Sequence, residues 1–157
     1  MLLDAGASPG YTANAVQLLR RTCEDHGRDP DELTVAQLIN TSIEDDPAVA
    51  LDAVRWEISS KFQYASTARA KMSVGEPVYD LDDVSPLRAA FERGGRAALS
   101  RALPADYVRA LSACGTADDV RAKVGEYRDA GVDIPLVRPA AERQLPALLA
   151  AFGHRQA

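Results

Sequence analysis

The chain has 157 residues, of which 46% are hydrophobic and 26% charged, so its composition is that of a folded domain rather than of a disordered segment. No basic run offsets its net charge of −5, which argues against nucleic acid and anionic membrane surfaces as partners. The sequence shows neither a signal peptide nor an apolar stretch of membrane-spanning length, and we expect one cytoplasmic domain over residues 1–157.

The start of the chain predicts a short strand followed by a helix. Residues 1–6 are typical of the end of an apolar strand. Ser8 is a good N-cap, Pro9 suits the first helical turn, and the helix should end near Gly27. The turn at Ala7 and Ser8 therefore presents the backbone N–H groups of a helix N-terminus, which suit an anion; the alternative is an ordinary N-cap.

The best predicted strand covers residues 33–43. Its apolar run lacks clean alternation, which is typical of a strand that is buried on both faces. Gln37 and Asn40 interrupt the run, and a buried amide without a partner costs about 1–3 kcal/mol. Each amide must therefore be satisfied by the protein, by water or by a ligand.

The middle of the chain predicts helices on either side of a long loop. Residues 44–47 precede a helix, and Trp56 lies off its apolar face and should pack against another segment. The loop over 72–85 has a length often found in functional insertions or mobile lids. Another helix starts at Ser85, is weakened by two glycines and is broken at Pro104. The apolar face of the first helix consists of Leu51, Val54, Ile58, Phe62 and Ala65.

The last third of the chain predicts a capped helix that leads directly into a strand. Thr116 can cap this helix, and Gly131 supplies the residue just past its end. An apolar strand over 132–137 ends at Arg138, and a terminal helix over 143–152 follows. Arg138 could bind a phosphate or a carboxylate, or form a surface ion pair.

Strands that alternate with helices indicate a parallel sheet, and hence an α/β fold. In such folds, ligands bind at the carboxyl ends of the strands. A complete (β/α)8 barrel needs about 250 residues, so the chain is too short to form one.

Five segments, by their order and spacing, resemble the bacterial luciferase-like monooxygenase family, and most of all its deazaflavin-dependent (coenzyme F-420) branch of methylenetetrahydromethanopterin-reductase-like proteins. The resemblance implies a helix-rich, partial (β/α)8 TIM barrel comprising about the last three strands. Residues 1–4, 33–43 and 132–137 would be strands six to eight. The segments are residues 5–11, 27–35, 103–104, 113–116 and 127–133.

The resemblance also implies an activity, that of a flavin- or deazaflavin-dependent oxidoreductase or monooxygenase. Such an enzyme passes a hydride between FMN or coenzyme F-420 and a small organic substrate, or activates oxygen with reduced flavin. In relatives, strand seven points polar side chains into the barrel mouth, beside the cofactor or substrate. Amides cannot shuttle protons at neutral pH, so no catalytic residue is assigned. The candidate cofactor-binding residues are Ala7, Ser8, Gln37, Asn40 and Arg138.

A second, non-catalytic interpretation stays open because strands one to five of the family barrel have no counterpart in the chain. A three-stranded open sheet has unpaired edges and an uncovered apolar face. Such a half-barrel would associate with a complementary N-terminal half-barrel or with itself as a homo-oligomer.

Other chemistry-bearing residues predict no further site. Cys23 and Cys114 lie far apart and match no metal-ligand spacing, so we expect reduced structural thiols and no metal. His26 suits a helix end and His154 lies in the tail, and neither has a catalytic partner at useful spacing. The acidic loop residues fit a solvated loop better than a cation site; they are Asp80, Asp82 and Asp83.

Overall fold

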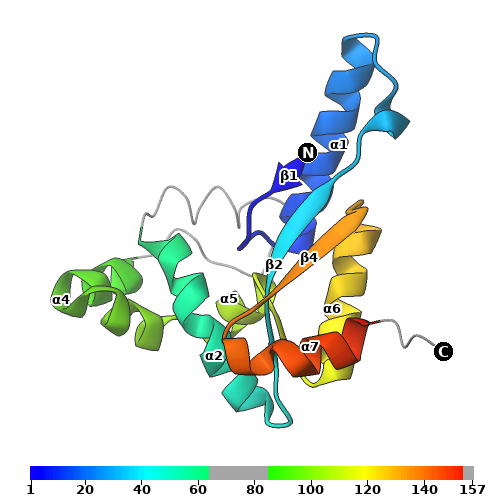
Figure 1. The fold of residues 1–157 in the computed structure, drawn as a ribbon. Helices are drawn as coiled ribbons and strands as arrows, with labels where there is room; N and C mark the ends of the chain where they lie inside the picture. The colour runs from blue at the N-terminus through cyan, green and yellow to red at the C-terminus, as the bar shows by residue number, and fades with distance from the viewer. Residues whose placement is uncertain (64–84, 154–157) are drawn as a thin grey trace.

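A computed structural model of the chain describes residues 1–63 and 85–153 (Figure 1). Of the loop predicted over 72–85, residues 72–84 with the acidic patch lie outside the described residues, as do Ala65 and His154. In chain order the elements are β1 (Leu2–Leu3), α1 (Pro9–Asp25), η1 (Pro30–Glu32), β2 (Ala36–Ile43), α2 (Pro47–Ser59), η2 (Ser60–Phe62), α4 (Ser85–Ala102), α5 (Ala105–Ala110), β3 (Ala113–Gly115), α6 (Ala117–Asp129), β4 (Ile134–Pro139), η4 (Glu142–Gln144) and α7 (Leu145–Phe152).

The strands form one parallel sheet with β2 at its centre, which confirms the predicted α/β fold. The strand β4 pairs with β2 from Ala36 to Thr41. Since β1 pairs with β2 at Ala36 and β3 pairs with it at Thr41, both short strands lie on the opposite edge of β2 from β4. The strand β3 was not predicted, because three residues are too few to show a periodic pattern.

Helices α1 and α6 cover one face of this sheet, which we call the helix face. On β2 it carries the side chains of Gln37 and Ile39, which alternate with those of the other face. The Thr12 hydroxyl of α1 donates to the Gln37 carbonyl at 3.1 Å. The Ile39 side chain packs with apolar side chains of α6 and of its flanking segments, namely Ala113, Val120, Val124, Tyr127 and Val132.

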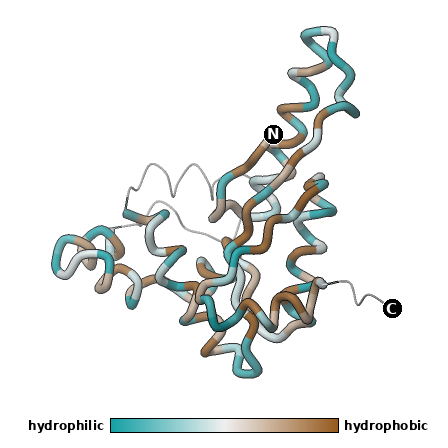
Figure 2. Tube along the Cα trace, in the orientation of Figure 1, coloured by the Kyte–Doolittle hydropathy of each residue, from teal (hydrophilic) through white to brown (hydrophobic). Residues whose placement is uncertain are grey.

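The other face of the sheet, which we call the open face, is apolar toward the amino ends of the strands. The register places three side chains in one row across β1, β2 and β4, those of Leu2, Ala36 and Ile134. The next row holds Leu38 and Leu136. Leu2, Ile134 and Leu136 are 64%, 48% and 40% exposed, so this part of the face is uncovered. Figure 2 shows apolar stretches of β2 and β4 running side by side.

A second apolar core lies between α2, α4 and α5. It joins α2 to α4 and α5 through buried side chains that include Leu51, Val54, Ile58, Leu99, Leu103 and Val108. Trp56 lies outside this core, and the Arg96 guanidinium of α4 stacks on its ring at 4.2 Å. This contact confirms that Trp56 packs against another segment. The predicted weak point in α4 is a kink, since Gly94 and Gly95 both have non-helical backbone angles.

Candidate functional site at the carboxyl edge of the sheet

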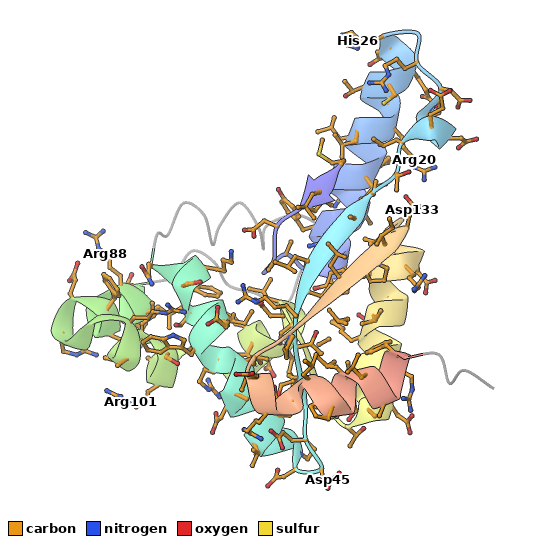
Figure 3. All side chains as sticks on the ribbon, in the orientation of Figure 1. Arg20, His26, Asp45, Arg88, Arg101 and Asp133 are labelled. Atoms are coloured by element: carbon orange, nitrogen blue, oxygen red, sulfur yellow. The ribbon has the colours of Figure 1, made fainter. Side chains whose placement is uncertain are left out.

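The carboxyl ends of the parallel strands define one edge of the sheet, where the predicted site residues gather. Figure 3 shows the two opposite edges: Asp133 lies where β4 begins, and Asp45 lies in the turn that follows β2. At the amino edge, the Asp133 carboxylate accepts a hydrogen bond of 2.7 Å from the Val35 N–H, which fixes β4 against the start of β2.

Ala7 and Ser8 lie after β1, and both are buried. The Ser8 hydroxyl accepts the Tyr11 N–H at 3.2 Å, so Ser8 is the N-cap of α1. The Ala7 carbonyl accepts the Tyr127 hydroxyl at 2.6 Å, which ties this turn to α6. These contacts hold the turn in place, and an anion at the helix N-terminus stays a prediction.

Gly6 allows the chain to pass close beneath a lysine of η2. Its φ of +74° lies in the left-handed region that favours glycine. A Cβ added there would lie 2.8 Å from the Lys61 Cγ. The Lys61 ammonium crosses this turn to pair with the Asp4 carboxylate at 2.8 Å. The segment between β1 and α1 is therefore shaped by both Gly6 and Lys61.

Gln37 lies on the helix face, which corrects the expectation that its side chain points into the barrel mouth. It is fully buried, and its amide nitrogen donates to the Asp4 carbonyl at 2.8 Å. Its amide oxygen accepts from Thr12 at 3.1 Å. The physical reason is the two-residue period of a strand: Gln37 and Asn40 are three residues apart and so face opposite ways. The protein itself satisfies the Gln37 amide.

Asn40 lies on the open face, and its environment differs from that of Gln37. Its side chain is buried, with 2% of the residue exposed, yet its Oδ1 has no hydrogen-bond partner among the described residues. A buried carbonyl without a donor costs about 1–3 kcal/mol, so the Asn40 side chain lowers the stability of the fold. Of the five predicted site residues, Asn40 alone has such an unpaired side-chain atom.

Arg138 is the register partner of Asn40 on β4, so the two side chains lie on the same face. Its guanidinium pairs with the Glu57 carboxylate of α2 at 2.5 Å, as the surface ion-pair alternative expected. The Arg138 side chain is still 45% exposed, and a guanidinium has five N–H donors. It therefore has donors left for a ligand anion.

The sequence analysis missed two further polar residues at this edge, Ser42 and Gln144. The Gln144 amide nitrogen donates to the Ser42 hydroxyl at 2.6 Å and to the Glu44 carboxylate at 2.8 Å. The Gln144 amide lowers the pKa of Glu44 below its ordinary value, with Arg143 also contributing and burial opposing the shift. Ser42 follows Asn40 by two residues, a spacing that signals a shared face. No sequence pattern marked Gln144. It was expected inside the terminal helix, but it lies in the 3-10 turn that precedes this helix.

Of the remaining candidates, Cys114 lies at this edge as the register partner of Ser42, whereas Cys23 and His26 lie at the end of α1. Cys23 and Cys114 are both free, and burial raises the pKa of the Cys114 thiol. Cys114 lines a pocket of about 440 Å³ together with Ser112, Arg109 and residues of α6. The exposed His26 lies at the tip of α1, with its Nδ1 2.8 Å from the Thr22 carbonyl oxygen (Figure 3).

Residues 1–63 and 85–153 hold no cluster of three or more histidine, cysteine or acidic side chains that could bind a metal. Within the same residues, no helix combines the length and apolarity needed to cross a bilayer.

Comparisons with solved structures show the same fold in larger chains. The coenzyme F-420-dependent tetrahydromethanopterin reductase from Methanopyrus kandleri matches with a TM-score of 0.69 and 22% identity, over 88% of this chain and 38% of that one. An F-420-dependent secondary alcohol dehydrogenase, solved with an F-420–acetone adduct, matches with a TM-score of 0.58 and 17% identity, over 90% of this chain and 37% of that one.

A riboflavin lyase, solved with modified FMN and its substrate riboflavin, matches with a TM-score of 0.50 and 18% identity, over 94% of this chain and 36% of that one. The chain thus spans well under half the length of these neighbours, which confirms a partial barrel. No curated protein matches the chain. The family described as luciferase-like monooxygenase matches residues 1–134, and the chain therefore belongs to the luciferase-like monooxygenase family.

Proposed function

We propose that the chain forms part of a flavin- or deazaflavin-dependent oxidoreductase that acts on a small organic substrate in the cytoplasm. Family membership supports the class, and so do the F-420-dependent and FMN-containing neighbours. When bound, FMN or coenzyme F-420 would supply the hydride chemistry. The chain's own residues would bind and orient the cofactor and keep water from it.

The observation that carries this proposal is the pairing of Asn40 with Arg138 at the carboxyl end of the open face. The apolar rows that lie below them suit the ring system of a cofactor. The unpaired Asn40 Oδ1 fits an N–H or O–H donor, and the Arg138 guanidinium fits a phosphate or carboxylate. These residues therefore match a ligand that is flat, polar at one edge and negatively charged at one end.

The turn at Ala7 and Ser8 is proposed as a second contact for an anionic part of the cofactor. Backbone N–H groups at the start of a helix carry partial positive charge, and α1 is long enough, at 17 residues, to have a macrodipole. Gln37 would act indirectly, since its amide links α1 to the loop after β1 and so fixes this turn.

A second candidate function is assembly with another half-barrel, which the uncovered apolar rows of the open face favour. Leu2, Ile134 and Leu136 present large side chains to solvent on one contiguous face. A complementary N-terminal half-barrel would cover them and supply the strands that larger family members have. A second copy of this chain is the alternative occupant, as a homo-oligomer.

A fluorescence titration tests the proposed function. The purified chain is mixed with FMN and, separately, with coenzyme F-420, and the change in cofactor fluorescence is followed together with oligomeric state by light scattering. Saturable binding of either cofactor supports the oxidoreductase proposal. Absence of binding by both, with the chain folded and self-associated, overturns it for this chain and leaves the assembly function.

A further inference from the structure

We infer that the side-chain carbonyls of Asn40 and Gln144 form a paired acceptor subsite for an uncharged part of the ligand that carries N–H or O–H donors. This inference rests on the proposed function and deepens it, because it names a residue and a ligand chemistry that family membership does not supply. It starts from two buried side-chain oxygens that have no hydrogen-bond partner within the described residues, Asn40 Oδ1 and Gln144 Oε1.

The orientation of the Gln144 amide is fixed by its neighbours. The Glu44 carboxylate can only accept hydrogen bonds, so the group that faces it at 2.8 Å must be the Gln144 NH2. The same nitrogen also donates to Ser42. The Gln144 carbonyl must then point away from both partners, and it lies in a residue that is only 2% exposed. It is therefore a buried acceptor without a donor.

Asn40 shares its strand face with Ser42, the residue to which Gln144 is bonded. Asn40 and Ser42 are two residues apart on β2, which places their Cα atoms about 6.6 Å apart with parallel side chains. Because Gln144 is bonded to Ser42, the two unpaired carbonyls flank one hydroxyl. In the proposed subsite, adjacent donor groups of one ligand bind the two carbonyls.

The charges around these carbonyls decide which ligand chemistry fits. The Glu44 carboxylate is ionised at neutral pH, and Arg143 pairs with it at 2.6 Å. Two carbonyl oxygens beside a carboxylate repel an anion and attract a donor. An anionic group of the same ligand is left to Arg138, which lies beside Asn40 on the neighbouring strand β4.

Matched flavins distinguish the two possible donors. Lumiflavin carries the ring N–H and no side-chain hydroxyls, 3-methyllumiflavin lacks that N–H, and FMN adds the hydroxyls and a phosphate. Dissociation constants are measured by fluorescence for the wild-type chain and for two variants, Asn40→Leu and Gln144→Lys. The lysine keeps a donor for Ser42 and Glu44 but has no acceptor.

We expect each variant to bind FMN about tenfold more weakly, the effect of one lost hydrogen bond to a buried acceptor. If the ring N–H is the donor, lumiflavin loses affinity to the same extent in the variants, and 3-methyllumiflavin binds the wild type as weakly as lumiflavin binds the variants. If the hydroxyls are the donors, only FMN responds to the variants.

Thermal unfolding supplies an independent measurement. Asn40→Leu should keep or raise the melting temperature, because no protein hydrogen bond to Oδ1 is lost. The control for stability is Gln37→Met, which removes a satisfied amide on the helix face and should lower the melting temperature by several degrees.

The two proposals fail in different ways. Equal affinities of wild type and both variants for all three flavins would overturn the acceptor subsite and leave the proposed function intact, with ordered water as the partner of the carbonyls. Absence of FMN and F-420 binding by the wild type would overturn the proposed function and the subsite together. A melting temperature lowered by Asn40→Leu as much as by Gln37→Met would also overturn the subsite.

Discussion

Asn40 on β2 and Arg138 on β4 are register partners, so an amide and a guanidinium lie side by side where the open face meets the carboxyl edge of the sheet. The amide is buried with an unpaired carbonyl, and the guanidinium is half exposed with a carboxylate on one side. A buried acceptor next to an accessible cationic donor can bind two different parts of one ligand. Four predictions follow from this arrangement and its surroundings.

Replacing Arg138 should weaken binding of the phosphate-bearing cofactor only. Arg138→Gln is expected to raise the dissociation constant of FMN about tenfold and to leave that of riboflavin, which has no phosphate, unchanged. The melting temperature should stay within about 2 °C, because an exposed ion pair contributes about 0–1 kcal/mol. The control is Glu57→Gln, which frees the guanidinium and should bind FMN at least as tightly. Equal losses for FMN and riboflavin would contradict a phosphate contact.

Glu44 should make stability depend on pH in the acid range. Its folded-state pKa is lowered from the ordinary value of 4.5, chiefly by the Gln144 amide, so the ionised carboxylate stabilises the fold. This contribution is fully present above pH 4.5 and is lost as the pH falls through the lowered pKa. In urea unfolding, Glu44→Gln should therefore be less stable than wild type at pH 7, and the difference should shrink below pH 4.5. A difference that stays constant from pH 7 to pH 3 would refute this role.

Gly6 and Gly27 form a matched pair that separates backbone conformation from close packing. Both have a left-handed φ, +74° and +69°, but an added Cβ meets Lys61 only at Gly6 and nothing within 4 Å at Gly27. Each alanine substitution should cost about 1–2 kcal/mol for the conformation. Gly6→Ala should cost more in chemical unfolding, because Lys61 must leave its pair with Asp4. If Gly6→Ala lost no more unfolding free energy than Gly27→Ala, Lys61 would be shown to move aside without cost.

The apolar rows should drive association of the isolated chain. Leu136→Gln, on the open face, is expected to shift the chain toward monomer in light scattering across a concentration series, because it places an amide in the uncovered row. Leu18→Gln is the control, since Leu18 is equally large and 62% exposed but lies on α1. If both variants, or neither, change the oligomeric state, the open face is not the surface that associates.

The sequence predicted the long elements well, because each has a period or a cap that acts over many residues. The Ser8 cap and the helix after it, the Thr116 cap, and the apolar strands all appear in the structure. Strand limits were shifted by about two residues, as for β4, which begins at Ile134 rather than at Val132.

The site was harder to predict, because its residues are distinguished by the face of the sheet on which their side chains lie and not by residue type. Gln37 and Asn40 look alike in the sequence, yet one amide is satisfied by Thr12 and Asp4 and the other has an unpaired carbonyl. Their spacing of three residues already predicted that the two side chains lie on opposite faces of the strand. Gln144 reaches Ser42 across about a hundred residues of chain, and no local pattern encodes such a contact.

The central strand β2 has a consequence for how the chain reaches its fold. Its amino end is bonded to a residue 98 positions later, since Val35 donates to Asp133. During synthesis, one side of β2 therefore stays unpaired until the residues around Asp133, 98 positions after Val35, have also left the ribosome. Closing so long a loop is slow, and an apolar strand left bare for that time is a target for chaperones and a seed for misassembly.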